Sequence, residues 1–170
     1  MKKAFGALFA VSSVFVLLAS LGVRAQAPSP TPQEWIRLGE QVHGGFGAFL
    51  PVGLRIGQDA LKRLDAKPRE VSVVYYDGEK TPCPCIADGI LMATAASPGQ
   101  GTLRVAAEKA APGLTGVAVI THRKTGKSVR YSIPGDVMPR VFEWNKAFDP
   151  AGRFAAAMKA ENIFTVADAN

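Results

Sequence analysis

The stretch that most constrains the fold is the apolar run from Ile86 to Ala96, in which Asp88 is the only charged residue. A helix that is apolar on most of its sides has to be covered by other elements on those sides. Both cysteines of the chain, Cys83 and Cys85, lie at the start of this run. We therefore expect a buried helix from Cys85 to Ala96, with two sulfur atoms near its first turn.

Periodic patterns on either side of this helix predict the elements that cover it. Thr31 and Glu34 form a capping box for a first helix, which reaches roughly His43 before glycines end it. Apolar spacing predicts a second helix over 53–64 and a last helix over 151–161. Strands are expected over 70–76, 102–107, 116–122 and 128–133. The order of elements predicts one α+β domain with a mixed or antiparallel sheet packed with helices.

Two glycines of the second predicted helix, Gly53 and Gly57, lie four residues apart and therefore on the same helix face. Neither residue has a Cβ atom that would keep a neighbouring element at a distance. We expect the backbone of another element to approach this face closely.

Residues 1–27 have the organisation of a secretory signal peptide, with two lysines, an apolar stretch and small residues in that order. We expect this segment to be cleaved on export, so the mature protein has no stable membrane span. A Pro-rich leader is expected over 28–32 and the folded domain over 33–165. These features are typical of a bacterial periplasmic protein.

The charge of the mature chain is modest. Loss of Lys2, Lys3 and Arg24 leaves 17 of the 20 basic residues against 14 acidic ones, which is a net charge near +3. Nucleic-acid binding proteins carry a stronger and more clustered positive charge. We therefore do not expect nucleic acid as a partner.

The two cysteines leave three alternatives open. A disulfide between Cys83 and Cys85 is a strained ring that spans one proline, so we expect it mainly as a resting oxidised form. Alternatively, the thiols are metal ligands or reactive groups, because a helix start favours thiolate. The third alternative is a pair of inert, half-buried thiols.

Two gapless blocks resemble the FmdE family, which takes its name from an accessory chain of formylmethanofuran dehydrogenase. The first block matches the family pattern H-G-H-x-G-P-F-L-x-x-G-x-R-x-G through His43, Gly44, Gly47, Phe49, Leu50, Gly53, Arg55 and Gly57. The second block resembles the family's cysteine–aspartate–glycine helix and the glycine turn that follows it. It contains Pro82, Cys85, Asp88, Gly89, Ile90, Thr94, Gly99, Gly101 and Leu103. The blocks occur in the family's order, and the resemblance covers about residues 33–133.

The resemblance implies an α+β fold in which histidines and a cysteine converge on a metal, often zinc. It places His43 and Cys85 at that site and Asp88 beside it. Imidazole nitrogen and thiolate sulfur suit zinc and other late transition metals. We therefore expect a transition metal such as zinc, or a small metal-containing ligand, as the partner. Because family members pair through this domain, we also expect a homodimer.

The chain departs from the family pattern at positions that matter for the ligand set. Gly45 occupies the position of the family's second histidine, and Ala96 occupies that of a cysteine often found after the helix. A closed structural zinc site needs four ligands. We expect Cys83 to replace the lost histidine, which gives His43, Cys83 and Cys85 around an open position.

Three functions are consistent with these residues. The first is a carrier or accessory domain that binds a metal or a metal-containing ligand. The second is an enzyme with a metal- or thiol-based reaction, in which Asp88 serves as acid or base beside Cys85. The third is a degenerate member with an interaction role.

Arg55 and His122 are two further polar residues whose chemical type suits ligand binding. Arg55 is expected either to extend to solvent or to bind an anionic ligand near the glycine segment. His122 is expected to be exposed at the end of a strand rather than to be a ligand.

Overall fold

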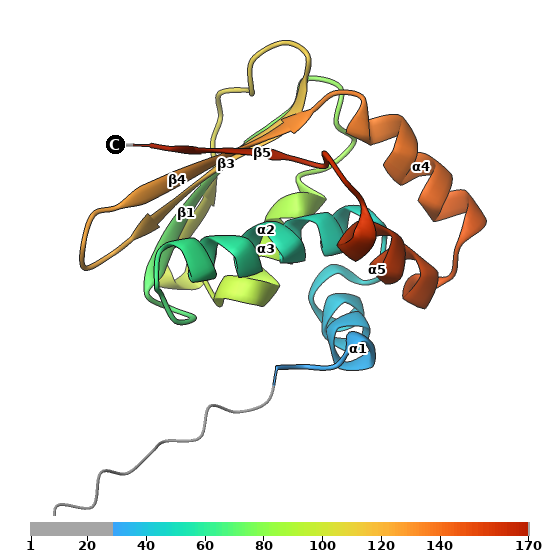
Figure 1. Ribbon diagram of the computed structural model, residues 1–170, viewed down its shortest axis with the longest axis horizontal. Helices are drawn as coiled ribbons and strands as arrows, with labels where there is room; N and C mark the ends of the chain where they lie inside the picture. Colours follow the sequence, from blue (N-terminus) through green and yellow to red (C-terminus); the bar gives the residue numbers. More distant parts are fainter. Residues whose placement is uncertain (1–28, 170) are drawn as a thin grey trace, which may run out of the picture.

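The computed structural model describes residues 29–169 (Figure 1). The helices of this part of the chain are α1 (Pro32–His43), α2 (Phe49–Arg63), α3 (Cys85–Thr94), the short 3-10 helix η1 (Pro98–Gln100), α4 (Val137–Ala147) and α5 (Pro150–Lys159). The strands are β1 (Val71–Asp77), β2 (Leu103–Val105), β3 (Leu114–His122), β4 (Ser128–Pro134) and β5 (Thr165–Asp168). Together they form one compact α+β domain, as the sequence predicted.

The five strands form one mixed sheet in the order β2-β1-β3-β4-β5. Strand β1 pairs in parallel with β2, and the other neighbours pair antiparallel. Alternate residues of β1 are buried, so one face of the sheet packs against the core. Figure 1 shows α1, α2, α3 and α5 on the same side of the sheet.

Helix α3 is almost fully buried, as its apolar sequence predicted. It packs against α2 without any gap between the backbones. A Cβ atom added at Gly53 would overlap the carbonyl oxygen of Ile86, and one added at Gly89 would overlap that of Leu50. The close approach of another backbone expected at this face is therefore confirmed at Gly53, while at Gly57 an added Cβ atom would first meet the side-chain methyl group of Ala93.

The contacts between α2 and α3 also give the direction of the two helices. Gly53 faces the first turns of α3 and Gly57 faces the later ones. The helices therefore run in the same direction, and their N-termini lie at the same end of the domain. That end is where the sequence predicted the functional site.

Several predicted boundaries were wrong. Helix α2 begins at Phe49 rather than at residue 53, since Pro51 lies in the first turn, where its missing N–H has no intrahelical role. Helix α3 ends at Thr94 rather than at Ala96, because Ala95 adopts the left-handed conformation with φ 53°. Strand β2 is shorter than predicted.

Besides the short 3-10 helix η1, two elements were not predicted at all. Val137, Val141 and Trp144 have the spacing of one helix face, and α4 buries the first two of them. Strand β5 has only four residues and weak alternation, so it depends on pairing with β4 for its identity.

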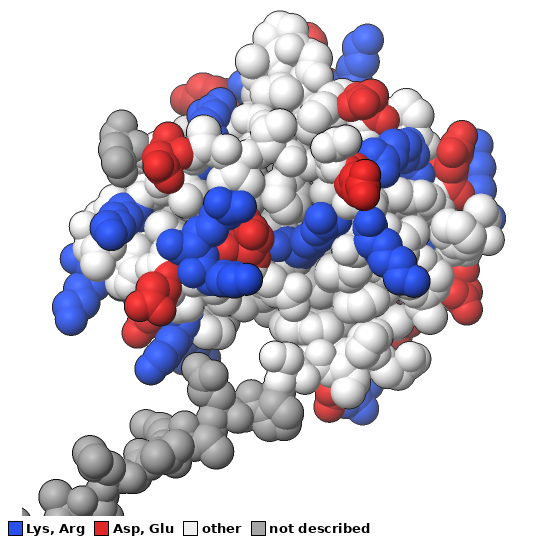
Figure 2. Space-filling model, viewed as in Figure 1, with Lys and Arg blue, Asp and Glu red and all other residues white. Residues whose placement is uncertain are grey.

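The surface shows charges of both signs. Figure 2 shows Lys and Arg interspersed with Asp and Glu on the face that it presents. Among the described helices, none has the length and apolar character needed to cross a membrane. The predicted signal peptide lies outside the described residues.

Candidate functional site

His43 is the last residue of α1, and a glycine fixes that position. The N–H of Gly44 donates to the Glu40 carbonyl oxygen while Gly44 itself is left-handed, with φ 82°. Residues other than glycine rarely adopt this conformation, so the helix stops there. The chain then turns toward α2, and the imidazole of His43 lies beside the start of α3.

Cys85 is the first residue of α3, and the helix start has no side-chain cap. The preceding residue, Pro84, offers no side-chain acceptor to the first backbone N–H groups. The N-terminus of α2 lies at the same end and, unlike that of α3, has no acidic residue in its first turn. Unpaired N–H groups and two aligned helix dipoles favour negative charge here.

Asp88 is the acidic residue in the first turn of α3, and it binds His43. The Nδ1 atom of His43 lies 2.7 Å from the Oδ2 atom of Asp88. A carboxylate only accepts hydrogen bonds, so Nδ1 donates. The side chains are 28% and 38% exposed, so the pair is open to solvent.

This hydrogen bond leaves the other ring nitrogen of His43, Nε2, to carry the lone pair of the neutral imidazole. Among the described residues, none forms a hydrogen bond with that atom. A carboxylate that orients a histidine through the opposite ring nitrogen is the usual support of a metal-ligating histidine. The sequence placed Asp88 beside the site but did not predict this contact.

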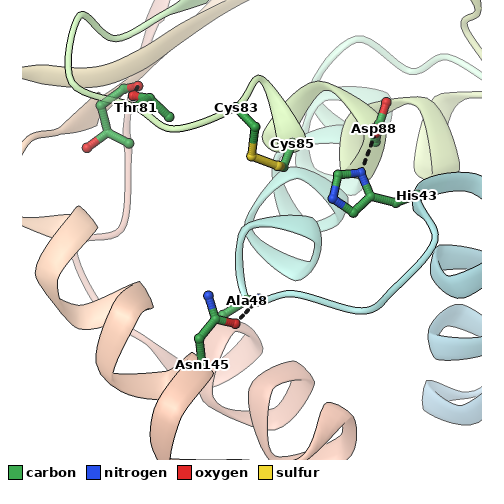
Figure 3. Close-up of a disulfide and its surroundings, with 8 residues drawn as sticks. His43, Ala48, Thr81, Cys83, Cys85, Asp88 and Asn145 are labelled. Atoms are coloured by element: carbon green, nitrogen blue, oxygen red, sulfur yellow. Dashed lines mark hydrogen bonds and ion pairs between the residues drawn. A yellow bond between two sulfur atoms is a disulfide. The ribbon is translucent and has the colours of Figure 1, made fainter.

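Cys83 and Cys85 form a disulfide (Figure 3). The sequence left three alternatives open for the two cysteines, and the structure contains the first of them, the disulfide. Cys85 is buried and Cys83 is partly exposed. Because Asp88 follows Cys85 by three residues on the same helix face, the disulfide and His43 share one small region. The structure therefore brings together His43, Cys83, Cys85 and Asp88.

The glycine-rich segment between α1 and α2 is held by residues that the sequence did not indicate. The Oδ1 atom of Asn145 accepts the Ala48 N–H at 2.8 Å, which satisfies a donor at the start of α2 (Figure 3). The guanidinium of Arg153 donates to the carbonyl oxygens of Phe46 and Asn145. Asn145 lies on the unpredicted helix α4, so its role could have been inferred only after that helix was recognised.

Arg55 is partly buried, and its guanidinium contacts protein groups. Its Nη1 atom donates to the carbonyl oxygens of Ala157 and Ala160, at the end of α5. The guanidinium also lies over the ring of Phe164, 5.4 Å from its centroid. These contacts satisfy carbonyl groups at a helix C-terminus, which is a structural role. Ligand binding by Arg55 stays a prediction.

His122 is buried, so the expectation that it is exposed was wrong. It is only 8% exposed, and its Nδ1 atom accepts the Lys124 N–H at 3.1 Å. That bond supports the turn after β3. His122 pairs with the buried Val71 in the register of β1 and β3, and directly opposed residues point to the same face of a sheet. The imidazole therefore lies on the buried face.

The disulfide limits which side chains of the oxidised protein are able to ligate a metal. Within residues 29–169, no group of three or more His, Cys, Asp or Glu side chains is placed to hold a metal ion. Nε2 of His43 fits such a role, but both sulfur atoms are bonded to each other and neither is a thiolate. The expected ligand set of His43, Cys83 and Cys85 therefore does not exist in the oxidised form.

The protein is an α+β domain in which helices pack on one side of a mixed sheet. At one end of this domain, where α2 and α3 begin, a histidine–carboxylate pair lies beside a disulfide and forms a polar site. The family model described as FmdE, molybdenum formylmethanofuran dehydrogenase operon, matches residues 42–165, which is most of the chain. The chain therefore belongs to the FmdE family, as its two sequence blocks predicted. No curated protein matches it.

Proposed function

We propose that this protein is an exported accessory or carrier domain that binds a transition metal in its reduced form. The ligands are Nε2 of His43 and the thiolate of Cys85, with Cys83 as a third ligand. The main observation that supports this proposal is the hydrogen bond between Asp88 and Nδ1 of His43. This bond directs Nε2 away from the carboxylate, and among the described residues Nε2 has no hydrogen-bond partner. Export is inferred from the signal-peptide pattern of residues 1–27.

The chemistry of these donors supports the proposal. Reduction converts the disulfide into two thiols next to an imidazole, and that mixture of nitrogen and sulfur donors suits zinc and related metals. Uncapped backbone N–H groups at the start of α3 stabilise negative charge on Cys85. Three protein ligands leave a position for water or for a donor from a partner, as in carrier or catalytic sites. Bound metal would act there as a Lewis acid.

Metal titration of the reduced protein tests the proposal. The purified mature protein is reduced with a phosphine, desalted under anaerobic conditions and titrated with Co²⁺, whose thiolate charge-transfer bands report sulfur ligation. We expect one equivalent to bind to the reduced protein and at least 100-fold weaker binding to the oxidised protein. Each thiol that ligates releases its proton, so binding is accompanied by acidification.

Matched variants assign the ligands. His43→Ala and Cys85→Ser are expected to abolish tight binding, and Cys83→Ser to weaken it. The control is His122→Ala, which removes the other histidine of the chain and leaves the site intact. Equal metal content in Cys85→Ser and the parent, or binding lost equally in His122→Ala, would contradict the proposal. So would a reduced parent that cannot be loaded, which would favour the degenerate interaction domain.

A gain-of-ligand variant gives an independent check. Gly45 stands where the family has a histidine, and a Cβ atom added there meets nothing within 4 Å. Gly45→His is therefore expected to be tolerated and to tighten Co²⁺ binding to the reduced protein by at least tenfold. Unchanged affinity would place the metal away from this segment.

A further inference from the structure

The disulfide between Cys83 and Cys85 cannot act as an effective structural crosslink. It joins residues only two positions apart, so it removes very little freedom from the unfolded chain. The segment before α3 is already held by other bonds. The hydroxyl of Thr81 donates to the Thr115 carbonyl oxygen at 2.7 Å, and the Ala87 N–H donates to the Pro84 carbonyl oxygen at 2.9 Å.

The two cysteines differ in their exposure to solvent. Cys83 packs against the edge of the core cluster but is partly exposed, and it lies between two exposed prolines, Pro82 and Pro84. Cys85 is only 6% exposed and packs within the core cluster. A thiolate from solution therefore reaches the sulfur of Cys83 first, with the sulfur of Cys85 behind it.

The same geometry stabilises the sulfur that departs. When the bond breaks, negative charge develops on Cys85, at the uncapped start of α3 and beside the start of α2. Backbone N–H groups and both helix dipoles stabilise that charge, and the carboxylate of Asp88 in the same turn, which is hydrogen-bonded to His43, opposes them in part. A better leaving thiolate speeds exchange at the opposite sulfur.

We propose that Cys83 and Cys85 form a redox-active pair that oxidises dithiols by thiol–disulfide exchange, with Cys83 as the sulfur that is attacked. This activity does not depend on the proposed metal. It requires the oxidised form, whereas the metal requires the reduced form.

The reaction balances without any further reagent. A substrate thiolate attacks the sulfur of Cys83, the bond between Cys83 and Cys85 breaks, and Cys85 leaves with the electron pair. The second thiolate of the substrate then attacks its own sulfur in the mixed disulfide, and Cys83 leaves. The substrate loses two electrons and becomes a disulfide. Its two protons end on the two cysteines.

The test uses metal-free protein in excess chelator. Oxidised mature protein is mixed with reduced glutathione, quenched with iodoacetamide at short times and examined by peptide mass spectrometry. We expect glutathione on Cys83 in at least tenfold excess over Cys85, and reduction by dithiothreitol at least tenfold faster than that of oxidised glutathione. Adduct mainly on Cys85, or a rate no faster than that reference, would overturn the proposal.

Two controls separate this proposal from the others. The exchange test is run without metal, so failure of the metal site leaves it intact, and the control variant Gly99→Ala, outside the site, is expected to keep the exchange rate within about twofold. Thermal unfolding of the oxidised and reduced parent is expected to differ by less than about 3 °C, since a three-residue ring contributes little. A large loss of stability on reduction would show that the bridge is structural, against the proposal.

Discussion

The contact between α2 and α3 and the site at the start of those helices differ in nearly every physical respect. The contact is made of backbone and small apolar groups, and no space is left at Gly53 or Gly89. The site contains a half-exposed imidazole, a carboxylate and a disulfide within a few residues of that contact. We therefore expect stability to depend on the helix contact, and the proposed metal binding and thiol exchange to depend on the site at its end, so that each can be altered separately.

The largest expected effect is on the helix contact. In Gly89→Ala the new methyl group would overlap the Leu50 carbonyl oxygen, so α2 and α3 have to separate. We expect the free energy of unfolding to fall by about 3 kcal/mol or more, because overpacking against backbone cannot be relieved by a rotamer change. Denaturant unfolding measures this loss.

The matched control is Gly99→Ala in η1, where an added Cβ atom meets nothing within 4 Å. It is expected to change the free energy of unfolding by less than about 0.5 kcal/mol. Equal effects of the two variants would show that the α2–α3 contact does not carry the stability assigned to it.

A smaller effect is expected at the site. Asp88→Asn keeps the size of the side chain but removes the carboxylate that orients His43. We expect Co²⁺ affinity of the reduced protein to fall 10- to 100-fold, as for other partners that orient a histidine ligand, with little change in unfolding free energy. Isothermal titration and denaturant unfolding on the same sample distinguish the two readouts. If Asp88→Asn unfolds more readily but binds metal normally, Asp88 supports the fold and does not orient a metal ligand.

The smallest effect concerns a buried carboxylate in the interior. Burial raises the pKa of Asp77, and its ion pair with Lys109, at 3.7 Å, opposes that shift only in part. The folded state therefore holds the proton to a higher pH than the unfolded state. Stability falls as pH rises from the unfolded pKa, about 3.8, to the raised folded pKa, and stays lower above it.

Asp77→Asn is expected to remove that part of the pH dependence. At neutral pH the variant should be neutral or more stable by up to about 1 kcal/mol, since an ionised buried carboxylate carries a desolvation cost. Unfolding free energies measured from pH 4 to pH 7 check this. An unchanged slope would mean that another group titrates in that range.

Local patterns predicted much of the fold. The capping box at Thr31, the buried helix after Cys85 and the close approach at Gly53 all follow from residue type and spacing, and the structure contains each of them. Strand β5 was missed because its sequence alternates weakly and its position depends on pairing with β4. Helix α4 has the spacing of one helix face at Val137, Val141 and Trp144, and that signal was overlooked.

The site was predicted less completely than the fold. Spacing and family resemblance placed His43, Cys85 and Asp88 in one region, but not the bond between His43 and Asp88. That contact joins residues 45 positions apart, and no local pattern encodes it. The burial of His122 was missed for the same reason, because it depends on strand pairing with β1.

The direct contact between the backbones of α2 and α3 has a consequence for how this domain can evolve. Main-chain atoms at Gly53 and Gly89 set the distance between the two helices, so that distance does not depend on the volume of any side chain at the site. New donor atoms can therefore replace old ones at the helix starts while the scaffold keeps its dimensions. A lineage with this fold can therefore exchange side chains at the helix starts by single substitutions without first acquiring a compensating change in the core.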